Sequence, residues 1–142
     1  MKAGIVTLFL AATILFTSCS KGYKPIDYGS DGCAHCKMTI MDARFGAEIV
    51  TGKGKVFKFD DILCLKQYLE EKNIEDEHLM IFVEKYNEQQ NDVTDATQAV
   101  YIKHESFASP MNGDYAAFAG IDDAQSLSDS LHADILEWRN LR

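Results

Sequence analysis

The chain has 142 residues and a formal net charge of −8 at pH 7, from 14 Lys and Arg against 22 Asp and Glu. This acidic balance argues against nucleic acid and anionic lipid as electrostatic partners, and it favours attraction to cations or to a basic protein surface. The length suffices for one domain or for two very small ones.

Residues 1–18 have the features of a secretory signal peptide. Lys2 precedes a short apolar run, Ile5 to Phe16, which is too short for a comfortable membrane span. Two small residues then stand directly before Cys19, and this arrangement resembles the bacterial lipobox, in which cleavage leaves the cysteine as a lipid-modified N-terminus. An ordinary signal peptide with an incidental cysteine is the alternative.

We therefore expect residues 1–18 to be removed and Cys19 to be acylated. The protein would then lie in the bacterial cell envelope, anchored to a membrane through lipid and facing the periplasm. Residues 19–30, which are polar and contain Gly, Pro and Ser, are expected to form a lipidated tether between the membrane and the domain.

Residues 31–86 are predicted to form a first β-β-α-β unit. Two β-prone runs are separated by a glycine-rich turn, which is a hairpin signal, and an amphipathic helix and a short apolar strand follow. The predicted elements are strands at 45–51 and 55–59, a helix from a cap at Asp60 or Asp61 to about Lys72, and a strand at 79–83.

Residues 87–98 are polar and acid-rich, and we expect a mobile loop there. The second unit, 99–142, repeats the pattern in outline, with strands at 99–103 and 115–119 and a helix capped by Asp122-Asp123. The two capped helices superimpose at an offset of 62 residues, which suggests a duplication, although such elements are common in any α+β protein. The predicted fold class is α+β, with two small, possibly duplicated units that share a core or an interface. Trp138 is expected to pack on that core or on the seam.

Potential metal-binding side chains are most concentrated in the run Cys33-Ala34-His35-Cys36-Lys37-Met38. It holds two thiols, an imidazole and a thioether within six residues. Thiolate and thioether are soft ligands that suit Cu(I), whereas carboxylates and carbonyls suit Mg²⁺ and Ca²⁺. Cu(I) is therefore the first metal that this run predicts.

The spacing of Cys33 and Cys36 also fits a redox disulfide or half of a zinc site. Thioredoxin-like enzymes place such a pair where a strand gives way to a helix, but here the pair follows a tether and precedes residues typical of loop and strand. His35 between the cysteines supports the redox alternative, because this arrangement occurs in strongly oxidising thiol enzymes. The alternatives left open are a periplasmic thiol–disulfide oxidoreductase and a structural zinc-binding interaction module.

Two residues outside this run bear on the site. Cys64 lies beside the apolar stripe of the first predicted helix, where we favour a buried structural thiol over a ligand. Met111 stands in the turn-rich segment 109–114, where no packing periodicity explains a large apolar side chain. The sequence contains no recognisable catalytic motif, so we predict that the protein is not an enzyme.

These features together resemble the NosL family over nearly the whole chain after Cys19. The residues that carry the resemblance are Cys19, Cys33-x-x-Cys36-x-Met38, the hairpin from Gly52 to Asp60, Pro110-Met111 and Ala117-Phe118. The resemblance implies an exported lipoprotein that binds Cu(I) and hands it to the maturation machinery of nitrous oxide reductase, with a fold of two related β-β-α-β units. Many members have a single cysteine before the methionine, so Cys33 departs from the pattern and the identity of the copper enzyme stays open.

By position, the resemblance assigns Cu(I) to Cys36, Met38 and Met111, with Cys33 and His35 as second-rank candidates. The thiolate would supply most of the affinity, while the neutral thioethers do not titrate at periplasmic pH. The expected partners are the copper enzyme, nitrous oxide reductase, or the proteins that mature it.

Overall fold

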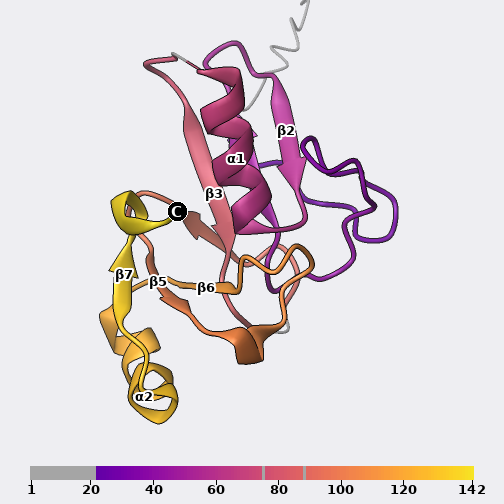
Figure 1. Ribbon diagram of the computed structural model, residues 1–142. Coiled ribbons are helices and arrows are strands. Elements are labelled where there is room, and N and C mark those ends of the chain that lie inside the picture. The colour runs from indigo at the N-terminus through magenta and orange to yellow at the C-terminus, as the bar shows by residue number, and fades with distance from the viewer. Residues whose placement is uncertain (1–21, 75, 88) are drawn as a thin grey trace, which may run out of the picture.

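The computed structural model describes residues 22–74, 76–87 and 89–142, so the predicted signal peptide and Cys19 lie outside the described residues. Two antiparallel sheets, each with one α-helix, make up the structure (Figure 1). The predicted α+β class is therefore confirmed. Within the described part of the chain, no helix is long and apolar enough to cross a membrane.

The first sheet has four strands in the order β2-β1-β3-β4, and α1 packs on one of its faces (Figure 1). These elements are β1 (Ala47–Val50), β2 (Val56–Phe59), α1 (Ile62–Lys72), β3 (Met80–Glu84) and β4 (Val93–Asp95). Asp61 caps α1, as its carboxylate accepts a hydrogen bond from the amide of Leu63 at 2.8 Å. The hairpin, the helix and the third strand lie where the sequence predicts them.

The second sheet has three strands in the order β6-β5-β7 and is accompanied by α2. Its elements are β5 (Val100–Lys103), the short 3₁₀ helix η1 (Glu105–Phe107), β6 (Tyr115–Phe118), α2 (Ile121–Leu131), β7 (Ile135–Glu137) and the 3₁₀ helix η2 (Trp138–Asn140). In the first sheet β1 pairs with β2 and β3, and in the second β5 pairs with β6 and β7, in each case antiparallel. This shared strand order is a similarity of topology and does not establish a duplication.

Two details of the predicted second half are wrong. The polar segment 87–98 contains β4, which pairs with β3, so part of the expected loop is an edge strand. Gly120, in extended conformation, caps α2, and Asp122 and Asp123 lie in its first turn. Carboxylates there interact favourably with the helix dipole without capping the helix, which is why an acidic pair misplaces the helix start. The two helices, and likewise β2 and β6, therefore differ by 59 residues and not by 62, while the other matching strands have smaller offsets.

The two sheets share one hydrophobic core. Its larger cluster contains Ile49, Phe59 and Leu65 from the first unit together with Tyr101 and Tyr115 from the second. Trp138 packs against the same cluster, as expected. The Nζ of Lys66, on α1, lies 4.5 Å from the centre of the indole ring and so adds a cation–π contact between the units.

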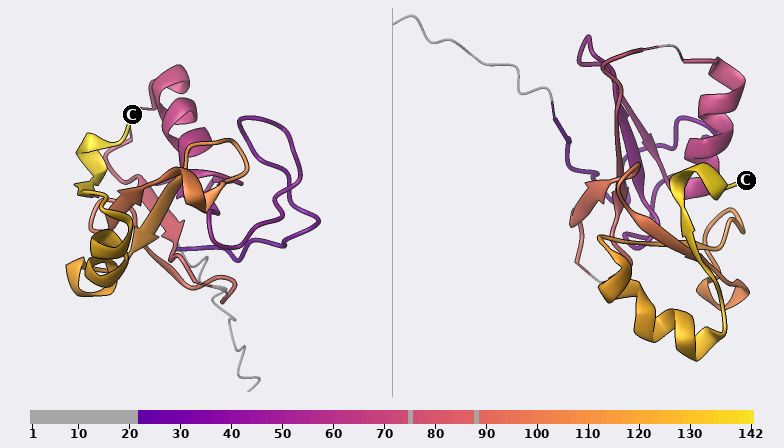
Figure 2. Two further views of the ribbon diagram at one scale, coloured as in Figure 1. Left: turned by 60° about the horizontal axis from the view of Figure 1, so that its bottom comes forward. Right: turned by 90° about the vertical axis from the view of Figure 1, so that its left-hand side faces the viewer.

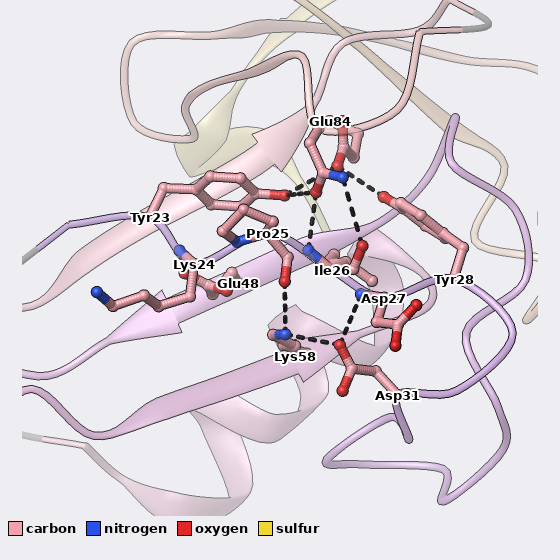
Figure 3. A network of polar contacts seen from close by, with 11 residues as sticks. Tyr23, Lys24, Pro25, Ile26, Asp27, Tyr28, Asp31, Glu48, Lys58 and Glu84 are labelled. Atoms are coloured by element: carbon pink, nitrogen blue, oxygen red, sulfur yellow. Dashed lines mark hydrogen bonds and ion pairs between the residues drawn. The ribbon is translucent and has the colours of Figure 1, made fainter.

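Residues 23–28 lie against the first sheet and do not form the free tether that the sequence predicts (Figure 3). We call them the N-terminal strap. Ile26 is buried in the main core cluster, the hydroxyls of Tyr23 and Tyr28 donate to Glu84 Oε1 at 3.1 and 2.6 Å, and the amide of Lys24 donates to Glu48 Oε1 at 2.7 Å. The strap therefore satisfies carboxylates that the sheet buries.

The strap and α1 cover opposite faces of the first sheet (Figure 2). Side chains alternate between the faces along each strand. Phe57 and Phe59 both contact Tyr68 of α1, and the centre of each phenylalanine ring lies 5.2 Å from the centre of the Tyr68 ring. Lys58, between them, points the other way and donates from Nζ to the carbonyl of Pro25 in the strap at 2.7 Å.

Glu48 should make the stability of the domain depend on pH. Burial raises the pKa of Glu48 from 4.5 to about 7, because desolvation disfavours its charge. Between pH 4.5 and about 7 the folded protein therefore holds a proton that the unfolded chain has lost. We expect the free energy of unfolding to be highest, as far as Glu48 is concerned, below pH 4.5. It should fall by up to about 3 kcal/mol as the pH rises from 4.5 through about 7. Urea unfolding at several pH values measures it.

The Glu48→Gln variant cannot lose this proton, so its free energy of unfolding should change less with pH over the same window. Glu77→Gln is the matched control, because Glu77 is exposed. An equal pH dependence in wild type and Glu48→Gln would contradict the assignment.

Candidate metal site

Three thiols and one carboxylate meet beside the N-terminal end of α1. The sulfur atoms of Cys33, Cys36 and Cys64 and a carboxylate oxygen of Asp60 all lie within 4.8 Å of one another. We call these four residues the thiol cluster. They come from three places in the chain: a loop before β1, the end of β2 and the first turn of α1.

A tight turn holds the two cysteines of the loop. The amide of Cys33 donates to the carbonyl of Met38 at 2.8 Å, and the amide of Lys37 donates back to the carbonyl of Cys33 at 3.1 Å. Lys37 adopts a left-handed conformation with φ of 68°, which closes the turn. The amide of Ala34 donates to the carbonyl of Lys58 at 2.7 Å and so fixes the turn to β2. The loop is thereby held beside the end of the strand that leads into Asp60.

The junction between β2 and α1 supplies the other two donors. Asp60 follows β2 directly, and Asp61 caps the helix, which places Cys64 in the first helical turn. The thiol of Cys36 donates to Asp60 Oδ1 at 3.4 Å. Cys33 and Cys64 are 2% and 0% exposed, whereas Cys36 is half-buried. Cys36 is therefore the thiol through which the cluster meets solvent.

The charges of the cluster are strongly coupled. The hydrogen bond with the thiol of Cys64 lowers the pKa of Cys33 and in turn raises the pKa of Cys64. Burial raises the pKa of Cys36, and burial together with the charge of Cys33 raises the pKa of Asp60 to about 6. A bound cation would displace the protons of these thiols, because the thiolate is the form that binds a metal.

This donor set fits a soft cation. Three sulfur donors are characteristic of Cu(I), and three thiolates with one carboxylate oxygen also match the four donors of a tetrahedral zinc site. The geometry does not match a thioredoxin-type redox pair, because Cys33 and Cys36 lie in a turn and not at the N-terminus of a helix. All three cysteines of the described chain are free thiols.

The predicted site residues are only partly gathered in this cluster. Cys33 and Cys36 belong to it, but His35 turns toward α1, where its Nδ1 lies 3.6 Å from Glu71 Oε2. Met38 is 55% exposed, and Met111 is half-buried against the main core cluster.

Two members of the cluster, Cys64 and Asp60, are not predicted as ligands from the sequence. Cys64 is buried, as we expected, yet its sulfur belongs to the thiol cluster, and Asp60 is predicted only as a possible helix cap. The spacing Asp60-x-x-x-Cys64 could have indicated this pairing. Residues four apart at the start of a helix can face the same side.

Comparisons with known proteins bear on the family and the fold of the chain. The family model described as NosL matches residues 27–142. Among solved structures, the crystal structure of the copper chaperone NosL from Shewanella denitrificans superimposes with a TM-score of 0.70 and 19% identity, and the match covers 84% of this chain and 95% of that one. At that identity the likeness concerns the fold. No curated protein sequence matches the chain.

The exposure of the three thiols predicts their order of alkylation in the metal-free, reduced protein. Cys36 should react first with iodoacetamide, although Cys33 has the lower pKa, because reagent must reach the sulfur before ionisation can speed the reaction. Fragment mass spectrometry after short exposure locates the label. Faster labelling of Cys33 or Cys64 would show that the cluster opens in a way that the structure does not describe.

Proposed function

The chain belongs to the NosL family, and we propose that it is a carrier that binds Cu(I) and passes it to a copper protein, without catalysing a reaction. The observation that supports this most directly is the thiol cluster, which offers a soft cation three sulfur donors in a largely buried position. The structural neighbour is itself a copper chaperone.

We propose Cys33, Cys36 and Cys64 as the principal ligands, with Asp60 beside them. This changes our sequence-based assignment, in which Cys64 was structural and His35 a candidate ligand. Three thiolates, two from the loop before β1 and one from α1, would hold Cu(I) against loss to solvent.

Met38 and Met111 remain proposed thioether donors at the edge of the cluster. Both lie close to it in the chain or in the fold: Met38 accepts the amide of Cys33 at its carbonyl, and the amide of Met111 donates to Asp61, the neighbour of Asp60. A neutral, exchangeable donor at the rim suits a carrier, because a partner's ligand can replace it and take the ion.

A structural zinc site is the second candidate, and one observation favours it. Four donors, three sulfurs and one carboxylate oxygen, lie close enough together to close around a tetrahedral ion. Zinc binding would stabilise the fold but would leave the exposed thioether of Met38 without a role.

We further propose that the carrier is exported and lipid-anchored through Cys19, because the start of the chain has the pattern of a signal peptide with a lipobox. Copper delivery would then take place on the periplasmic side of the cell envelope. The recipient would be nitrous oxide reductase or the proteins that mature it.

Titration of the reduced protein against a chromogenic Cu(I) chelator should show one tightly bound Cu(I) per chain. Cys36→Ser and Cys64→Ser should each weaken binding by more than about 100-fold, since loss of a direct ligand should exceed the loss of a supporting group. Met38→Leu should weaken it by about tenfold, because leucine keeps the volume but removes the sulfur. Met41→Leu is the matched control, as Met41 is 68% exposed and only three residues further on.

Two outcomes of this titration would contradict the proposal. Protein that purifies with tightly held zinc and ignores Cu(I) would support the structural zinc site. Unchanged affinity in Cys64→Ser would confine the metal to the run from Cys33 to Met38.

Membrane attachment is tested separately. Cys19→Ser should move the protein from the membrane fraction to the soluble periplasmic fraction, because it removes the acylated side chain. Fractionation with mass spectrometry of the N-terminus measures both effects. Retention of Cys19→Ser in the membrane, with no lipid mass on the wild type, would rule out the lipoprotein assignment.

A further inference from the structure

Asp61 makes more contacts than a helix cap requires. Its carboxylate is 1% exposed, and Oδ1 accepts the capping hydrogen bond from the amide of Leu63. The second oxygen, Oδ2, accepts from the hydroxyl of Ser109 at 2.6 Å and from the amide of Met111 at 2.9 Å. One carboxylate thus joins the start of α1 to a loop about fifty residues later in the chain.

That loop, residues 109–114, is built to approach α1 closely, and it reaches the end of α1 at which the thiol cluster lies (Figure 1). Ser109 also accepts the amide of Asp114 at its hydroxyl at 2.8 Å, and its own amide donates to Asp114 Oδ1 at 3.0 Å. A Cβ atom on Gly113 would lie 2.6 Å from both Asp61 Oδ1 and the Cβ of Leu63. Only glycine fits there without moving the loop, because the Cβ of Leu63 is fixed by the helix backbone.

These contacts fix the backbone of Met111 next to the thiol cluster. Met111 lies between Ser109 and Gly113, and its amide is bound by the residue that directly follows Asp60. Its side chain packs against the same core cluster as Cys36. The loop comes from the second unit, so its attachment to Asp61 decides where Met111 lies relative to the cluster.

We propose that Asp61, together with Ser109 and Gly113, is a positioning group that holds Met111 at the rim of the thiol cluster, so that its thioether completes the Cu(I) site. This inference rests on the proposed function. It adds residues that touch no metal themselves and assigns the second unit a part in the affinity for copper.

Asp61→Asn separates the two tasks of the carboxylate. Asparagine caps helices as well as aspartate does, but its amide nitrogen would face the hydroxyl of Ser109 and the amide of Met111, which both donate to Oδ2. The cap should survive and the attachment of the loop should fail. Ser109→Ala removes one of the two loop contacts and leaves the cap untouched. Asp76→Asn is the matched control, because Asp76 accepts the amides of Gly52 and His78 and is not a member of the thiol cluster.

The test is Cu(I) titration of the full mature chain in a double-mutant cycle. Asp61→Asn and Ser109→Ala should each weaken Cu(I) binding by about tenfold, the size of losses when a metal ligand loses its support, and Asp76→Asn should have no effect. In a Met111→Leu background, Asp61→Asn should change the affinity by less than about twofold, because the thioether that it positions is already absent. The methyl resonance of Met111 should shift on addition of Cu(I) in wild type and not in Asp61→Asn.

The outcomes separate this inference from the proposed function. A wild type that does not bind Cu(I) overturns both. A wild type that binds, with Asp61→Asn unchanged, overturns only the positioning role. The same holds if Asp61→Asn costs a further tenfold in the Met111→Leu background, since Asp61 would then act on the cluster without Met111.

Discussion

The junction between β2 and α1 is the constraint on which the rest of the site depends. Two adjacent carboxylates, Asp60 and Asp61, are buried there and make different contacts. Asp60 accepts from the thiol of Cys36, while Asp61 caps the helix that carries Cys64 and binds the loop that carries Met111. Because a buried carboxylate must be hydrogen-bonded to be stable, each of these contacts also fixes the fold around the junction.

Buried carboxylates also lie on the opposite face of the same sheet, where other groups supply their hydrogen bonds. Glu48 and Glu84 are fully buried, and the N-terminal strap covers them with a backbone amide and two tyrosine hydroxyls. Each still has one oxygen without a hydrogen bond among the described residues. Desolvation then raises the pKa of both groups, so this face favours neutral carboxyl groups.

The shared core links the thiol cluster to both halves of the chain. The thiols all come from the first unit, but Tyr101, Tyr115 and Ala117 of the second unit belong to the same core cluster as Cys33 and Cys64. Displacement of one unit would therefore disturb the packing around these thiols. For a carrier, such rigidity lowers the cost of ordering the ligands around the ion, while the half-buried Cys36 leaves a route for exchange.

The sequence by itself determined the α+β class, the two strands and the helix of each unit with the strand β3 that follows α1, and the soft donors at Cys33 and Cys36, because these depend on local periodicity, turn residues and residue chemistry. It misplaced the start of α2 and missed β4, since caps and edge strands depend on neighbours as well as on local propensity. Only the tertiary structure decided that Cys64 and Asp60 join the cluster, that His35 turns to Glu71 and that the expected tether packs on the sheet. The physical reason is the same in each case. The partner of a side chain depends on which distant segments of the chain pack together, and a local sequence pattern does not show this.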